Sequence, residues 1–126
     1  MRILFFCLLL LHFSVSLAQS EEEIIDSPDV EATFPEGTAA MQNWIAANVF
    51  YPQSAIENNE QGKVYLSFIV ELDGSLTNIK IVRGVSSNLD KEAIRVIKKM
   101  PKWEAAEYKA KKVRTICRLP INFRMN

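Results

Sequence analysis

The stretch that most constrains the fold is residues 63–72, KVYLSFIVEL. Every second residue in it is apolar, beginning at Val64, and this alternation predicts an extended strand with one fully buried face. The opposite face is only half polar, because Tyr65 and Ile69 interrupt its polar residues. Since a strand with apolar residues on both faces usually lies inside a sheet, we expect residues 63–72 to form the central strand.

Turn and cap residues define the elements around this strand. Asp73-Gly74 follows it and is a strong signal for a tight hairpin, so residues 76–82 should return antiparallel. Residues 103–112 should be a connection that ends in a basic turn. Helices are expected at residues 38–48 with Thr38 as the cap, at residues 53–58 beside Pro52, and at residues 87–100 with Ser87 as the cap and Asp90 as its capping-box partner.

Pro120 marks the last predicted strand, residues 113–123, as an edge strand, because proline has no N–H to donate to a neighbour within a sheet. Alternate residues of a strand point their backbone groups to the same side, so Arg114, Ile116 and Arg118 should share the outward direction of Pro120. Such an edge could accept a partner strand, or its Arg and Pro residues could simply protect it. Physical reasoning alone leaves both interpretations open.

The charges of the chain balance, since its 126 residues include 15 Lys and Arg and 15 Asp and Glu. No global field therefore points to a nucleic acid or an acidic substrate, and the length suits one domain. The charges are nonetheless unevenly distributed: the charged residues in the range 21–36 are acidic, whereas those in the range 80–124 are mostly basic. This pattern is typical of either a basic binding face or, more commonly, a solvated surface.

Residues 1–18 have the pattern of a signal peptide, with a basic Arg2, an apolar core and small residues before a cleavage site after Ala18. The alternative is an uncleaved membrane anchor, but the apolar run is shorter than the roughly 20 residues of a spanning helix. Residues 19–33 are acidic and lack periodicity, so we expect a flexible leader, followed by a single domain at residues 34–126.

Few residues of the mature chain suit catalysis or metal binding. The only histidine leaves with the signal peptide, and we interpret the one remaining cysteine, Cys117, as a small buried apolar residue. The carboxylate pairs Glu104/Glu107 and Asp90/Glu92 lie in polar, cap-like or loop contexts that need no catalysis. Since the sequence also lacks a phosphate loop and a nucleophile elbow, we expect no enzyme activity, no cofactor and no metal.

A series of short motifs occurs in order along residues 34–124: Phe34-Pro35-Glu36-Gly37, Trp44-Ile45, Tyr51-Pro52, Gly62-Lys63-Val64, Asp73-Gly74-Ser75, Val82-Arg83-Gly84-Val85, Leu89-Asp90-Lys91-Glu92-Ala93, Met100-Pro101-Lys102-Trp103 and Leu119-Pro120-Ile121-Asn122-Phe123. Together they resemble the C-terminal domain of TonB, in the version found in Bacteroidetes-type bacteria. The similarity spans nearly the whole mature chain.

The resemblance implies an α+β fold, a two-layer sandwich with helices on one face of a three-stranded, mainly antiparallel sheet. It also implies that the domain captures the TonB box, a short extended peptide of an outer-membrane transporter, by adding it beside the last strand. Tyr51-Pro52 matches a Tyr-Pro pair of the family, although Tyr51 could equally be a packing residue. The partner-binding residues expected are Tyr51, Pro52, Arg114, Ile116, Arg118 and Pro120.

The chain departs from a complete TonB, which has a membrane helix that engages the ExbB–ExbD motor and a long Pro-rich segment. Because the leading segment here looks cleavable and the leader is short, we expect a periplasmic module that binds the TonB box in energy-coupled transport. Two alternatives remain: a membrane-anchored transducer that engages ExbB–ExbD, and an envelope assembly module that uses the same edge to form a homodimer or to bind other envelope proteins. Glu36 also stands where the family often has a second glycine.

Overall fold

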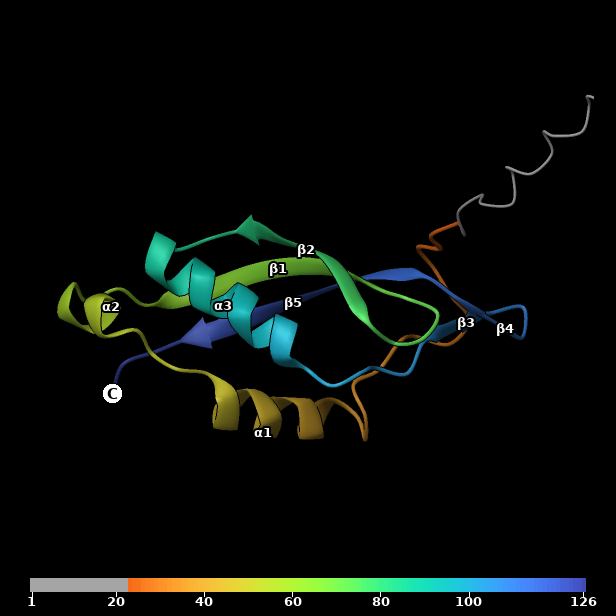
Figure 1. Cartoon of the computed structure of the whole chain (residues 1–126), viewed down its shortest axis with the longest axis horizontal. Coiled ribbons are helices and arrows are strands. Elements are labelled where there is room, and N and C mark those ends of the chain that lie inside the picture. Colours follow the sequence, from red (N-terminus) through yellow and green to blue (C-terminus); the bar gives the residue numbers. More distant parts are fainter. Residues whose placement is uncertain (1–22) are drawn as a thin grey trace, which may run out of the picture.

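The computed structural model of the chain describes residues 23–126 (Figure 1). The predicted signal peptide, residues 1–18, lies outside this part of the chain. The elements in order are α1 (Thr38–Asn48), α2 (Gln53–Glu57), β1 (Gly62–Val70), β2 (Leu76–Arg83), α3 (Ser87–Lys99), β3 (Ala106–Tyr108), β4 (Lys111–Val113) and β5 (Thr115–Phe123).

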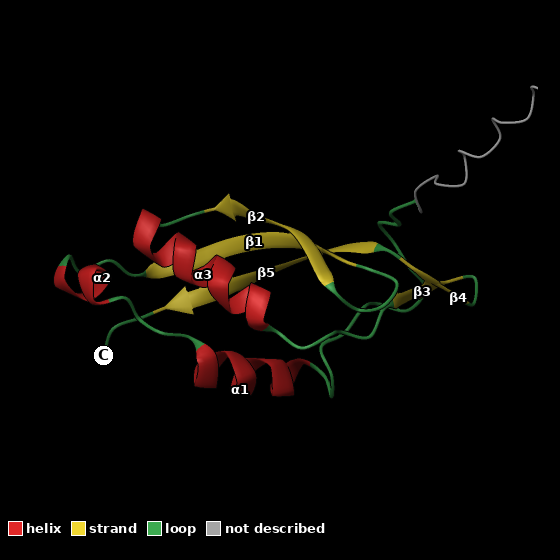
Figure 2. Ribbon diagram, in the orientation of Figure 1, coloured by secondary structure: helices red, strands yellow, loops and turns green. Residues whose placement is uncertain are grey.

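The main sheet has the strand order β2-β1-β5, with both neighbours antiparallel to β1 (Figure 2). The central position predicted for residues 63–72 is therefore confirmed. The inward side chains of β1 explain this position, because Val64, Leu66, Phe68 and Val70 are each at most 1% exposed. Figure 2 shows α3 lying over one face of the sheet, α1 beside β5 and α2 at one end, so the predicted α+β fold, with helices and a three-stranded antiparallel sheet, is confirmed as well.

The core lies between β1 and the helices, mainly under α3. Four residues of α3 at helical spacing are at most 1% exposed: Leu89, Ala93, Val96 and Ile97. Trp103 seals one end of this core, with its ring centroid 5.3 Å from that of Phe68. Its backbone also bonds the β1–β2 turn, where a Cβ on Gly74 would lie 2.0 Å from the Trp103 carbonyl oxygen. Only glycine fits at position 74, because Gly74 also has a φ of +89°, a conformation that other residues rarely adopt.

Both predicted helix caps are wrong by one residue. Thr38 is the first residue of α1 instead of its cap, and the N-cap, Gly37, has no side chain to offer. Ser86 caps α3 in place of Ser87, because its hydroxyl accepts a hydrogen bond from the Leu89 N–H. Asp90 accepts a hydrogen bond from the Val85 N–H, which fixes the chain just before the helix.

The predicted connection and basic turn at residues 103–112 form a second, two-stranded sheet, in which β3 pairs antiparallel with β4. Lys109 and Ala110 make the turn, and both have a positive φ, as a two-residue hairpin of this hand requires. The strand predicted at residues 113–123 is consequently divided. Its first residue belongs to β4, and Arg114 separates β4 from β5.

Residues 23–33, expected to be part of a flexible leader, are instead hydrogen-bonded to the domain. Val30 exchanges two backbone hydrogen bonds with Glu107, and Thr33 exchanges two with Glu104. The Asp29 carboxylate accepts a further hydrogen bond from the Lys109 N–H, at 2.8 Å. Ala32 is buried in the core. The ordered domain therefore begins before residue 34, because the backbone groups of this segment form hydrogen bonds with β3 and with the residues next to it.

Candidate strand-addition site

The candidate site is the outer edge of β5. On its inner side β5 pairs with β1 along its whole length, from Thr115 opposite Val70 to Phe123 opposite Gly62. In the described residues 23–126, no strand of the sheet lies on its other side. Pro120, opposite Tyr65, occupies a position where its missing N–H costs no ladder hydrogen bond. The prediction that Pro120 marks an edge strand is thus confirmed.

The backbone direction of the outward residues follows from two observations. The carbonyl of Arg114 accepts a hydrogen bond from Ile25, so it points away from β1. Pro120, which is an even number of residues further along, cannot donate towards β1. Since backbone direction alternates, Ile116, Arg118 and Asn122 also point outward. Within residues 23–126, no other segment forms a backbone hydrogen bond with these three residues on this side.

The start of the edge is occupied by the chain itself. Ile24 forms a parallel bridge with Arg114, the Ile25 N–H donates to the Arg114 carbonyl at 2.9 Å, and the Thr115 hydroxyl donates to the Ile25 carbonyl. The segment then leaves β5, because Asp29 and Val30 bond to Glu107. It therefore covers the edge only at Arg114, and the edge from residue 116 to residue 122 stays open.

A groove of about 600 Å³ lies between α1 and this open edge. Figure 1 shows α1 running beside β5, on the side away from β1. Four residues of α1 and the loop after it form one wall: Gln42, Ile45, Ala46 and Val49. The end of β5 and the residues after it form the other: Pro120, Ile121, Asn122, Arg124 and Asn126. Every second side chain of a strand added to β5 would point into this space.

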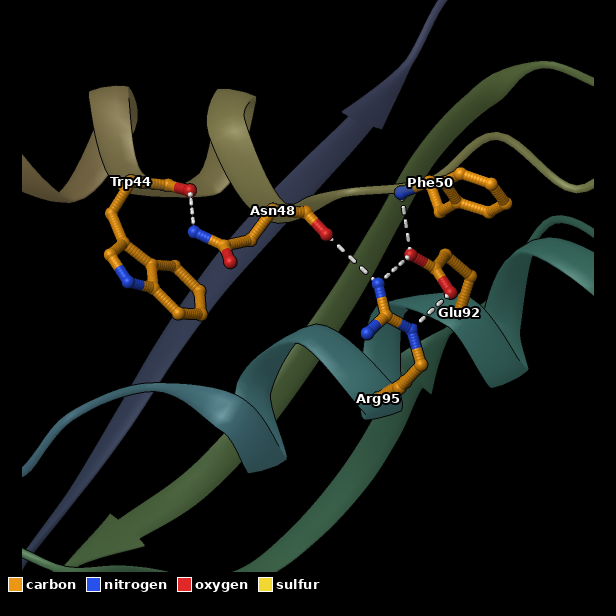
Figure 3. A network of polar contacts seen from close by, with 5 residues as sticks. All are labelled: Trp44, Asn48, Phe50, Glu92 and Arg95. Carbon is orange, nitrogen blue, oxygen red and sulfur yellow. Dashed lines mark hydrogen bonds and ion pairs between the residues drawn. The ribbon is translucent and has the colours of Figure 1, made fainter.

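A polar network holds α1 at this position (Figure 3). The Arg95 guanidinium donates to the Glu92 carboxylate through two nitrogens, each at 2.7 Å, and to the Asn48 carbonyl at 2.9 Å. The Phe50 N–H donates to the same carboxylate, and the Asn48 amide donates to the Trp44 carbonyl. The C-terminal end of α1 is thereby joined to α3, which in turn packs on the sheet.

Glu92 keeps its charge in this network although its side chain is only 8% exposed. Burial alone would raise the pKa of its carboxyl group, but hydrogen bonds from Arg95 and from the Phe50 N–H outweigh burial. The pKa is therefore lower than the usual value for Glu. Because the charged carboxylate is what binds Arg95, the attachment of α1 to α3 depends on this ionised state.

The predicted site residues on β5 differ in their availability. Arg118 and Pro120 are exposed, and Ile116 is partly exposed. Arg114 is already engaged, because its guanidinium pairs with Glu71 at 2.7 Å. This hydrogen bond from Arg114 is the main reason that the pKa of Glu71 is lowered. The side chain of Arg114 thus fixes the end of the sheet, in addition to any contact with a partner.

Tyr51 and Pro52 lie at the far end of the strand and do not line the groove. The Tyr51 ring packs edge-on against the Phe123 ring, with 5.7 Å between the two ring centroids. The Tyr51 hydroxyl donates a hydrogen bond to the Glu60 carbonyl. Burial, followed by the charge of Glu60, raises the pKa of this hydroxyl. Pro52 is the N-cap residue of α2. These contacts give Tyr51 a packing role, which was one of its two expected interpretations.

Other chemistry is sparse in the described residues. Burial is the main reason that the pKa of the Cys117 thiol rises to about 11, so Cys117 is a neutral, partly buried side chain. Among residues 23–126, no group of three or more His, Cys, Asp and Glu residues could hold a metal ion. A search of the same residues for a helix able to span a membrane found none.

Sequence reasoning missed the groove wall on α1. Ile45 is buried, but it also lines the groove. Gln42, Ala46 and Val49 carried no signal of their own. The one available clue was the outward direction predicted for Pro120, which lines the groove together with Asn122 and Arg124.

Comparison with known proteins gives a family. A family model described as the Gram-negative bacterial TonB protein C-terminal matches residues 47–125, more than half of the chain. The search of curated proteins found no match. Two solution NMR structures of the Helicobacter pylori TonB C-terminal domain are similar, each with a TM-score of 0.49. One is 25% identical in sequence, and the similarity covers 70% of this chain and 95% of that chain. The other is 22% identical, and the similarity covers 74% of this chain and 91% of that chain.

The family match includes the edge strand, the groove wall at Val49 and the Tyr51-Pro52 pair. The resemblance seen in the sequence motifs is therefore confirmed: this chain belongs to the TonB C-terminal domain family.

Proposed function

We propose that this chain is a periplasmic module that binds the TonB box of outer-membrane transporters by adding the peptide as a strand to β5. Membership of the family indicates an envelope protein with a TonB-like role in energy-coupled transport, and the family is non-catalytic. The observation that carries the proposal is the open edge at residues 116–122 beside the groove under α1. Strand addition to an open edge is a general mode of peptide recognition.

The backbone of the edge supplies the affinity in this proposal. Ile116 and Arg118 each offer an outward N–H and C=O, whereas Pro120 offers only a C=O. Each hydrogen bond to the peptide contributes about 0.5–1.5 kcal/mol net. Alternate side chains of the peptide enter the groove, where Ile45 and Val49 present apolar surface, and this contact supplies selectivity.

The remaining predicted residues support the ends of the site. Arg114 lies where the chain's own Ile24 ends the open edge, so the peptide pairs from residue 116 onward. Tyr51 and Pro52 support the other end, because Tyr51 packs against Phe123 at the end of β5. We assign these three residues to the boundary of the proposed site.

Replacing Ile116 by proline tests the mechanism. The substitution removes an outward N–H while leaving the hydrogen bonds to β1, which come from the alternate residues. Titration with a fluorescent TonB box peptide should show an affinity at least about tenfold weaker, because the peptide loses one hydrogen bond and keeps an unpaired carbonyl.

The matched control is Ile116→Ala, which shortens the same side chain but keeps the N–H. Its affinity should stay within a few-fold of the original protein, and both variants should keep the original circular dichroism spectrum. Equal affinity of Ile116→Pro and Ile116→Ala would reject strand addition at this edge.

A further inference from the structure

The face of the sheet that carries no helix presents a cluster of cations. Among residues 23–126, α3 lies over the opposite face and α1 lies beside β5 (Figure 2). Strand register places Arg83 beside Tyr65, Lys80 and Arg118 on either side of Ser67, and Lys63 beside Asn122. The four cations, Lys63, Lys80, Arg83 and Arg118, are all exposed. We call them the open-face cations.

No carboxylate balances these cations within the strands. The described residues of β1, β2 and β5 contain no Asp or Glu. Glu71, which follows β1, is already paired with Arg114 at 2.7 Å. The whole chain has equal numbers of acidic and basic residues, so the open face is a local concentration of positive charge in a neutral protein. Such a face attracts an anionic partner even though the net charge does not.

The shape of the face indicates what kind of partner fits. Its hollow, next to Ile69 and Ile116, has a volume of only about 50 Å³, which is too small for an ordinary small-molecule ligand. Protein interfaces favour shape complementarity and are poor in Lys, whereas two of the four open-face cations are Lys. A fluid surface, whose charged groups can move to meet dispersed cations, suits this face better.

Two further side chains suit the boundary between water and lipid. The Arg83 guanidinium lies 4.9 Å from the centre of the Tyr65 ring, which places a partly buried aromatic side chain among the cations. Tyrosine is enriched at membrane–water interfaces because its ring is apolar and its hydroxyl is polar. Val82 lies next to Arg83 at a register shift of the edge strand β2 and is 61% exposed, so the rim of the sheet carries apolar surface.

We propose that the open face docks on a lipid surface that bears anionic headgroups. In this orientation the helices face away from the lipid, and the open edge of β5 runs along the surface, accessible from the side. Arg118 belongs to both sites, but the inference goes beyond peptide binding and does not depend on it, since Lys63, Lys80, Arg83 and Tyr65 take no part in the proposed strand-addition site.

Co-sedimentation with vesicles tests the proposal. At low salt, the full mature protein should bind vesicles that contain phosphatidylglycerol and should not bind pure phosphatidylcholine vesicles. Binding should weaken as salt is raised to 0.5 M, because exposed charges are then screened. The double variant Lys63→Gln/Lys80→Gln should bind roughly 30-fold more weakly at low salt, since each cation near an anionic surface strengthens binding by a factor of about five.

The matched control is Lys91→Gln/Lys98→Gln, which removes the same charge from exposed residues of α3 on the other side of the molecule. It should bind the anionic vesicles as tightly as the original protein. Three results would each overturn the proposal: no binding to anionic vesicles, equal weakening in both double variants, or equally tight binding to soluble poly-glutamate. The last result would indicate an acidic protein as the partner of this face.

Discussion

Glu36 occupies a turn position whose backbone conformation suits glycine. The Gly37 N–H donates to the Phe34 carbonyl at 2.8 Å, Pro35 stands at the second position, and Glu36 has a φ of +69° at the third. This is the geometry of a type II turn, in which the third residue is usually Gly or Asn. Residues other than glycine are strained there because their Cβ approaches the carbonyl oxygen.

We therefore expect Glu36→Gly to stabilise the protein by about 0.5–1 kcal/mol. Glycine relieves the backbone strain, but part of this gain is offset because glycine loses more conformational entropy on folding. Urea denaturation would measure the free energy of unfolding. Glu36→Ala is the control, since alanine keeps the Cβ and should bring no gain. An equal gain in both variants would attribute the effect to the lost charge instead of to the backbone.

Single residues also show where sequence reasoning succeeds. Pro120 identified the edge strand because its missing N–H acts directly on strand pairing. The caps of α1 and α3 were each misplaced by one residue, because adjacent Ser86 and Ser87 offer the same hydroxyl group and the sequence does not distinguish them. The ion pair of Arg114 with Glu71 joins residues far apart in the chain, so no local sequence pattern predicts it.

At the scale of elements, strong periodicity and turn residues made prediction accurate. Strands β1 and β2 lie where alternation and Asp73-Gly74 placed them, and the three helices lie close to the ranges that the cap residues and Pro52 indicated. The β3–β4 hairpin was missed because its strands are only three residues long and its turn, Lys109-Ala110, lacks the usual Asn or Gly. Residues 23–33 were missed because pairing through single bridges needs no periodic pattern.

The attachment of α1 to α3 depends on the charge of Glu92, and this gives a second prediction. Glu92→Gln should lower the free energy of unfolding at pH 7 by about 1–2 kcal/mol, a value reduced for the partial exposure of Arg95. The pKa of Glu92 is lower in the folded protein than in the unfolded chain. Its stabilisation is therefore present above the unfolded pKa and is lost as the pH falls through the folded pKa.

Urea denaturation at pH 7 and at pH 3 would measure this dependence, and the difference between Glu92→Gln and the original protein should narrow at the lower pH. Glu104→Gln, which changes an exposed carboxylate, is the control and should have little effect at either pH. A constant difference at both pH values would mean that the ionised carboxylate is not what holds the network.

At the scale of the whole molecule, the fold of residues 23–126 leaves the β5 edge of the sheet open and places a helix beside it. The strand order β2-β1-β5 exposes β5, and the network around Glu92 fixes α1 so that a groove of about 600 Å³ remains between them. The chain covers only the first position of this edge with its own Ile24. The sequence indicated the edge but not the groove, because a groove depends on how helices pack and not on the pattern of any one element.

Amide hydrogen exchange on the peptide complex, followed by NMR, tests this account most directly. The N–H groups of Ile116, Arg118 and Asn122 should exchange fast in the free protein and slowly after a TonB box peptide is added, because they point away from β1. Those of Cys117, Leu119 and Ile121 should be slow in both states, since they face β1. Peptide binding that leaves Ile116 and Arg118 exchanging fast would contradict strand addition to β5.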